Sequence, residues 1–360
     1  MANLEELRET IHNIEDLDTV VRTMRALAMV NTRQYESALA ALAAYGETIV
    51  LGLQAALRQP RFSDGPLPMT ARLGEFDLSG SRQTHPLAAR LASDPSVAEL
   101  GSTHAAMVSA RPGAGTTTSP LTVGMDRRAG EARFPAGHRG LVLFGSDHGL
   151  CGPFNEQILA LALRLLEPGN ADGEGEHGRW RLAVVGTKLS GLLEAEGRSP
   201  ETTLRQPHGL AGVDGLMADL LMAIETWRQD STLQGVWLLY HRCRSSAALE
   251  PVLSRLLPID ATWLQELARR PWQSRSLPQV QGDGFTVLAT LLRESLAHQL
   301  SEASVTSLAA ENTARLLAMQ AARSHMEDRL ADLNALFRQQ RQSAITEELL
   351  DVVAGFEALR

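Results

Sequence analysis

The most reactive group of side chains lies in the run "GSDHGLCGPFN", Gly145 to Asn155, which contains Asp147, His148 and Cys151. A thiol activated by an imidazole is the chemistry of nucleophilic catalysis. Catalytic partners usually come together from distant parts of a fold, however, and a free cysteine is among the most buried residue types. The spacing therefore favours a small thiol packed beneath a tight turn over a nucleophile.

The glycines of the same run could serve a second chemistry. A glycine-rich turn between a strand and a helix can present backbone N–H groups to a phosphate. The run contains neither GxxxxGK[ST] nor the dinucleotide-binding GxGxxG. Glycine spacing alone is a weak signal, so we predict no cofactor here.

Other polar side chains offer no stronger site. His241, Arg242 and Arg244 could bind an anion at the end of a strand, although a solvated strand end is the simpler interpretation. His298 and His325 lack the i, i+4 partner of a helical zinc site. We therefore predict no catalytic residue and no metal site.

Composition limits the class of protein. The chain has 360 residues, of which 44% are hydrophobic and only 4% aromatic, which favours helix over a β-rich fold. A net charge of -8 without long runs of one sign argues against a nucleic-acid partner. Two distant cysteines predict a reducing compartment. No uninterrupted apolar run of about 18 residues is present, and the first residues do not resemble a signal peptide, so we expect any membrane role to be peripheral.

Both ends of the chain have the three-four apolar spacing of long paired helices. The seam predicted from Leu4 to Leu57 includes a polar residue, Asn31, which would cost stability but fix the register. The helix predicted from Gly284 to Arg360 would extend roughly 110 Å at ~1.5 Å per residue, and so it needs a partner helix. The apolar positions that we assign to the two seams are Leu4, Leu7, Ile11, Ile14, Leu17, Val21, Met24, Ala28, Tyr35, Ala38, Leu42, Tyr45 and Ile49, and then Met319, Met326, Leu330, Leu333, Phe337, Ile345, Leu349, Val352, Phe356 and Leu359.

The middle of the chain alternates between strand and helix patterns, which indicates a mostly parallel sheet. We therefore predict an α/β fold with a long antiparallel coiled coil of the N- and C-terminal helices and a Rossmann-like central domain. Predicted strands cover Gly140–Asp147, Arg181–Gly186, Gly235–Cys243 and, less clearly, Pro251–Ile259, and predicted helices cover Pro153–Pro168, a short segment ending at Leu193, and Asp214–Gln229. Trp263–Gly284 is predicted to be a connector.

These patterns divide the chain into four parts. They are an N-terminal helix at 1–58, a loop-rich insertion at 59–138, the α/β domain at 139–283 and the C-terminal helix at 284–360. The insertion is rich in Gly, Pro, Ser and Thr, and we expect it to lie on the surface of the α/β domain, with one short helix near Pro86 to Ala92.

Three motifs, in this order, resemble the γ subunit of F-type ATP synthases. They are "SDHGLCGPFN" (Ser146–Asn155), "SLAAENTARLLAMQAA" (Ser307–Ala322) and "RQSAITEELLDVVAGFEAL" (Arg341–Leu359). A weaker similarity is "TVVRTMRALA" (Thr19–Ala28). His148 and Pro153 replace the family's more usual Arg and Gly, and the insertion is longer than usual, which suggests a divergent or alternative F-type ATPase.

The resemblance implies a non-catalytic central-stalk rotor that couples ion flow to ATP synthesis or hydrolysis on its neighbours. It implies α and β subunits as the surrounding catalytic ring, an ε subunit and a membrane c-ring as further partners, and a peripheral place on the cytoplasmic face of a bacterial inner membrane. Three groups of residues follow from it: ring contacts at Met24, Arg25, Arg341, Gln342, Glu347 and Glu348; an apolar tip at Ile345, Leu349, Leu350, Val352, Val353 and Phe356; and a motif turn at Ser146, Asp147, Gly149, Cys151, Gly152 and Asn155.

Two other classes of protein fit parts of the pattern. An enzyme with a Rossmann-like domain and coiled-coil dimerisation arms would need a cofactor fingerprint, which the sequence lacks. A structural or signalling coiled-coil protein would leave the strand-turn motif unexplained.

Overall fold

The structure is a computed structural model that describes residues 2–59, 137–167, 180–229, 233–244, 248–272, 274–276 and 278–358. Residues 60–136, which make up nearly all of the expected insertion and include its helix near Pro86, lie outside the described residues. The chain forms two compact units, each described by itself below. The first unit comprises Met1–Val30, Leu150–Gly152 and Arg315–Arg360, and the second comprises Asn31–Gly149 and Pro153–Ala314.

A mixed sheet forms the centre of the second unit. Its described strands lie in the order β3-β2-β1-β4-β5. All neighbours are parallel except β5, which pairs antiparallel with β4 at one edge. The strands are β1 (His138–Phe144), β2 (Trp180–Val185), β3 (Thr202–Leu204), β4 (Leu233–Arg244) and β5 (Ala248–Leu257). The predicted α/β class is confirmed, but the three-residue β3 was not predicted because it carries no apolar run.

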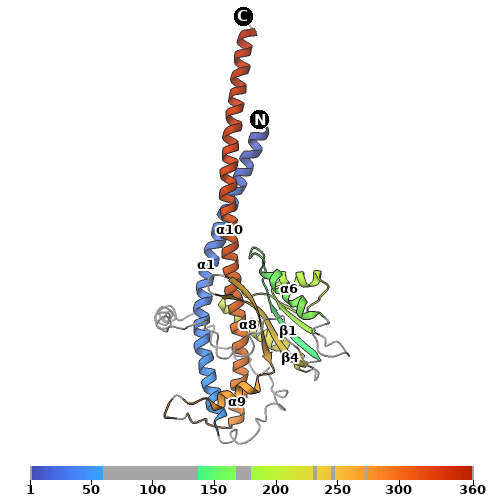
Figure 1. The fold of residues 1–360 in the computed structure, drawn as a ribbon, viewed down its shortest axis with the longest axis vertical. Coiled ribbons are helices and arrows are strands. Elements are labelled where there is room, and N and C mark those ends of the chain that lie inside the picture. The colour runs from blue at the N-terminus through green and yellow to red at the C-terminus, as the bar shows by residue number, and fades with distance from the viewer. Residues whose placement is uncertain are drawn as a thin grey trace. The chain divides into compact units, whose positions relative to one another are not determined.

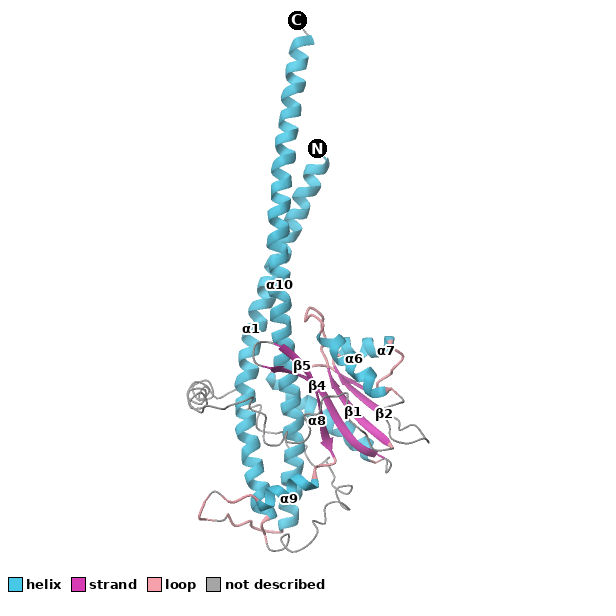
Figure 2. Cartoon of the chain, in the orientation of Figure 1, coloured by secondary structure: helices cyan, strands magenta, loops and turns pink. Residues whose placement is uncertain are grey.

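Helices cover both faces of this sheet (Figure 2). In β1, Leu141 and Leu143 pack toward one face, with α6 and α7, while Val142 and Phe144 pack toward the other, with α8. Successive side chains of a strand point to opposite faces, so a strand buried on both sides reads as a continuous apolar run. The helices are α6 (Phe154–Leu166), α7 (Thr187–Ala195) and α8 (Val213–Arg228), the last preceded by the 3-10 turn η5 (Leu210–Gly212).

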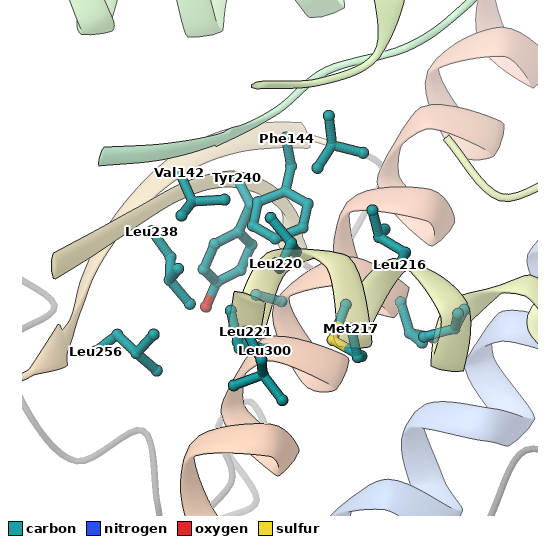
Figure 3. Packing of buried hydrophobic residues seen from close by; sticks show 14 of the residues in the cluster. Val142, Phe144, Leu216, Met217, Leu220, Leu221, Leu238, Tyr240, Leu256 and Leu300 are labelled. Carbon is teal, nitrogen blue, oxygen red and sulfur yellow. The ribbon is translucent and has the colours of Figure 1, made fainter. Parts of the chain in front are cut away.

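The face covered by α8 belongs to a core that also includes both terminal helices. Figure 3 shows Leu300 of α10 beside the α8 side chains, opposite Val142, Phe144 and Tyr240 of the sheet. Leu42 of α1 joins the same cluster. The sheet and the helix pair are therefore held by one continuous apolar core within this unit.

The two terminal helices run side by side in this unit (Figure 1). They are α1 (Ala2–Leu57, 56 residues) and α10 (Gly284–Ala358, 75 residues). Asn31 Nδ2 donates to Asn312 Oδ1 at 3.4 Å, and Tyr45 Oη donates to a Glu294 carboxylate oxygen at 3.1 Å. The residue number on α10 falls from 312 to 294 as the residue number on α1 rises from 31 to 45. The two helices are therefore antiparallel, as predicted.

The predicted connector contains a helix, α9 (Ala261–Arg269), so that part of the prediction was wrong. The Asp260 carboxylate caps it by accepting from the Thr262 N–H at 2.9 Å. The Thr262 hydroxyl also donates to this carboxylate, at 2.6 Å, and that hydrogen bond is the main cause that lowers the pKa of Asp260. Trp263, Leu264 and Leu267 of α9 are buried against the end of α1 and the start of α10. The N-cap and the three-four spacing were signals that the sequence already carried.

In the first unit, α1 and α10 are joined by an ion pair rather than by the leucine that we had placed on the seam. Leu17 is 56% exposed, whereas Asp18 faces Arg323, with 3.9 Å between their charged atoms. Arg22 also donates to Asp18. The seam prediction was therefore wrong at this position, because the drift of a 3.6-residue helix brings Asp18 inward.

By length and composition alone, α1 contains a stretch that could cross a membrane. In the second unit, the same helix contributes Ala38, Leu42, Ile49 and Leu53 to buried clusters. Packing within the second unit therefore accounts for part of its apolar content.

Tyr45 makes the stability of the second unit sensitive to alkaline pH. Burial, together with the charge of Glu294 and the hydrogen bond to it, raises the pKa of Tyr45 to about 12. An unfolded tyrosine titrates near ~10. The stabilisation is therefore complete below pH ~10 and is lost as the pH rises toward 12.

We expect urea unfolding to show a wild-type loss of stability between pH ~10 and ~12 that is smaller in Tyr45→Phe. Glu294→Gln removes the carboxylate charge beside Tyr45, and it should reduce this loss of stability at high pH only in part. Parallel pH profiles for the wild type and Tyr45→Phe would contradict the assignment.

Candidate functional site

The predicted motif turn is held by reciprocal hydrogen bonds between Ser146 and Asn155. The Ser146 N–H donates to Asn155 Oδ1 at 2.9 Å, and Asn155 Nδ2 donates to Ser146 Oγ at 2.8 Å. Ser146 Oγ in turn donates to the His148 carbonyl at 2.7 Å. Both Ser146 and Asn155 are buried. These two residues therefore fix the path of the chain from β1 into α6.

Asp147 ties the same turn to two other elements. One carboxylate oxygen accepts from the Thr187 N–H at 2.8 Å, at the start of α7, and the other accepts from the Gln206 N–H at 3.1 Å, just after β3. The amino end of a helix attracts negative charge. The first donor of α7 is thus used by a carboxylate of the chain itself.

Gly186 permits this close approach. Its φ is +107°, and a Cβ there would lie 2.7 Å from the Ser146 nitrogen. Only glycine tolerates both conditions, so Gly186 is part of the arrangement that holds the turn.

The remaining motif residues are Gly149, Cys151 and Gly152. Gly149 has open space where a Cβ would stand, and Gly152 has a φ of +60°. Cys151 is buried. The structure therefore brings Ser146, Asp147 and Asn155 together in one turn, and the burial of Cys151 agrees with the packed thiol that the sequence favoured.

The residues of the suggested anion site, His241, Arg242 and Arg244, lie within β4, and His241 is part of the core while Arg244 is exposed. His241 is fully buried, its Nε2 lies 2.9 Å from the Phe154 carbonyl oxygen, and its ring lies against that of Phe154. Burial lowers the pKa of His241 and raises the pKa of the Cys243 thiol. A neutral imidazole and a protonated thiol suit packing better than anion binding or nucleophilic attack.

The predicted apolar tip is exposed in the first unit. The exposed fraction of the side chains ranges from 49% at Ile345 to 63% at Leu350, and Leu349, Val352 and Val353 lie within this range. The side chain of Phe356 lies outside the described residues. Figure 1 shows why: the amino end of α1 stops part-way along α10. The seam that we predicted to continue through Ile345 thus has no α1 residue to cover it.

The polar residues that we predicted as ring contacts are placed on both helices of this unit. Arg341, Gln342, Glu347 and Glu348 are exposed on α10. Met24 and Arg25 are partly buried on α1. Their role as contacts stays a prediction.

A second exposed apolar surface was missed by sequence reasoning. Leu17, Val20, Leu27 and Val30 are all more than half exposed on α1. Their spacing of three and seven residues places them along one side of the helix. We call these four residues the outer stripe. Its signal was present in the sequence, but we had used Leu17 for the inner seam.

Thr187, Gln206 and Glu311 were also missed as site residues. The first two bind Asp147, and Gln206 Nε2 also donates to the buried carboxylate of Glu311 on α10. Glu311 lies within the second family motif, whereas no pattern marked Thr187 or Gln206.

Comparison with known proteins decides the family. The model of the ATP-synt family, described as ATP synthase, matches residues 3–359. The chain belongs to this family. The resemblance drawn from the motifs is thereby confirmed.

Named members of the family are similar over most of their length. The ATP synthase gamma chain of Polaromonas naphthalenivorans is 27% identical over 61% of this chain and 74% of its own. The ATP synthase gamma chain of Bacteroides fragilis is 29% identical over 60% of this chain and 72% of its own.

Solved structures show the same fold. A chain of the Euglena gracilis mitochondrial ATP synthase OSCP/F1/c-ring structure, at 12% identity, gives a TM-score of 0.54 over 99% of this chain and 95% of its own. A chain from the rotor structure of the same enzyme, at 13% identity, gives 0.52 over 96% and 99%. The long paired helices and the central sheet are thus a fold that the family shares.

Loss of the Asn155 side chain should destabilise the second unit. Asn155→Ala leaves the buried Ser146 N–H without its acceptor, which costs about 1–3 kcal/mol. Urea unfolding measures this effect. As a control, Asn334→Ala removes an exposed amide that bonds only within its own helix, and it should change stability by less than about 0.5 kcal/mol. Equal effects of the two variants would show that Asn155 does not hold the turn.

Proposed function

We propose that this chain is the central-stalk rotor subunit of a rotary ATP synthase. Family membership and relatives named ATP synthase gamma chain support the proposal. The observation that carries it furthest is the exposed apolar surface of the first unit, made of the outer stripe of α1 and the tip of α10. Exposed apolar surface of this extent indicates a partner that covers it.

In this proposal α and β subunits form a ring around the paired helices. The tip residues Ile345, Leu349 and Val353 turn within an apolar bearing, where nondirectional contacts allow sliding. Arg341, Gln342, Glu347 and Glu348, with Met24 and Arg25, make transient polar contacts that change as the helices turn. Nucleotide chemistry takes place on the partners.

Coupling follows from asymmetry. An asymmetric shaft presents a different surface to each subunit of the ring, so each position favours a different conformation of that subunit. Rotation therefore changes nucleotide affinity, and nucleotide binding acts back on rotation with the same free energy.

The α/β domain occupies the foot of the stalk in this proposal. The ε subunit and the membrane c-ring are its partners there. The chain would thus be peripheral to the membrane, on the cytoplasmic face of a bacterial inner membrane.

Copurification tests the assignment. Coexpressed with α and β subunits of its own operon, the tagged chain should recover both, and the complex in membrane vesicles should couple ATP hydrolysis to ion pumping. Failure to recover either subunit, combined with dinucleotide binding by the purified chain, would favour the coiled-coil enzyme instead.

The ring contacts can be tested separately. Arg341→Ala and Gln342→Ala should each lower ATP-driven ion pumping by roughly threefold to tenfold, the effect of losing one important interface contact. Their exposed side chains predict unchanged melting of the isolated chain. The control is Arg329→Ala, which alters an exposed arginine of the same helix outside the predicted contacts. An equal loss of pumping in the control would remove the special role of Arg341 and Gln342.

A further inference from the structure

Among the described residues of the second unit, both apolar and polar contacts join the α/β domain to α10, and two of them matter here. One is the apolar core that contains Leu300 and Leu308. The other is a polar chain from Asp147 through Gln206 to Glu311. The polar chain links the first and second family motifs through a residue that belongs to neither.

Gln206 is the centre of this chain. Its backbone N–H donates to Asp147 Oδ2 at 3.1 Å, and its side-chain oxygen lies 3.5 Å from the Asp147 nitrogen. Its side-chain amide donates to Glu311. The amide therefore uses its acceptor toward the sheet and a donor toward α10, and this fixes its orientation.

Glu311 is only 3% exposed. A buried carboxylate is costly unless it is hydrogen-bonded, so its bond to Gln206 has a strong energetic reason to persist. Apolar packing differs in this respect, because the hydrophobic effect is nondirectional and tolerates small sliding movements. Buried polar pairs are best known for fixing the register of packed helices.

We propose that Gln206 and Glu311 are positioning residues that lock α10 to the α/β domain against slipping under load. The inference rests on the proposed rotor function. A rotor passes torque from its foot to its shaft, and the two must keep one register while it does so. In this proposal the apolar core holds the α/β domain against α10, and the Gln206–Glu311 hydrogen bond fixes the position of one along the other.

A charge swap in the complete complex tests this inference. Gln206→Glu places two carboxylates against each other. In the double variant Gln206→Glu with Glu311→Gln, the amide at position 311 can donate to the carboxylate at position 206, so the hydrogen bond is restored with its donor and acceptor exchanged. The carboxylate at position 206 also keeps an oxygen that can accept from the Asp147 N–H. The measurements are ATP hydrolysis and ATP-driven ion pumping against an opposing gradient in vesicles. The matched control is Gln299→Leu, because the Gln299 amide bonds only to Ser295 within α10.

We expect Gln206→Glu to lower pumping per ATP by roughly tenfold, the factor that loss of a charge-assisted hydrogen bond has on an equilibrium between engaged and slipped registers. The exchanged pair should recover most of the coupling, and Gln299→Leu should keep it. A merely structural role would lower the amount of complex but leave pumping per ATP unchanged.

Unchanged coupling in Gln206→Glu overturns the inference, and so does a swapped pair as uncoupled as the single variant. If Gln206→Glu does not assemble, the swapped pair decides: coupled complex supports the register role, and absent or uncoupled complex refutes it. A wild-type chain that neither assembles nor pumps would instead reject the proposed function.

Discussion

The antiparallel pairing of α1 with α10 is the contact on which the rest of the structure depends. Neither helix could remain in water alone with so many apolar positions on one side, and helices owe most of their stability to such packing. In the second unit the pairing also supplies one wall of the sheet's core, through Leu42 and Leu300. The α/β domain is thus built against the helix pair and completes its own interior with it.

Much of the fold could be predicted from the sequence, because the spacing of apolar residues along the chain indicates whether a segment forms a helix or a strand. The three-four spacing identified the helix pair, and apolar runs identified β1, β2 and β4. Leu17 was assigned wrongly because a strict seam ignores the drift of a real helix, which brings Asp18 inward to Arg323. The short edge strand β3 has too few residues to show any period.

The candidate site was predictable in part, for a different reason. Ser146, Asp147 and Asn155 stand close together in one motif, so their meeting needs only a local turn. Gln206 lies 59 residues from Asp147 and 105 from Glu311, and only the folded sheet brings it to both. Exposure of the α10 tip depends on where α1 begins, a comparison between the two ends of the chain that neither end shows alone.

The shared core also has a consequence for how the chain is made. Its members extend from Tyr35 on α1, through Val142 and Leu238 of the sheet, to Leu308 on α10. During synthesis the sheet strands emerge well before the helix that completes their covering. The nascent α/β domain must therefore wait with an open apolar face until α10 has left the ribosome, and such faces invite nonspecific association. Contacts so distant in sequence also slow folding. The shared core thus makes the sheet and the helix pair of the second unit dependent on each other from the start of folding.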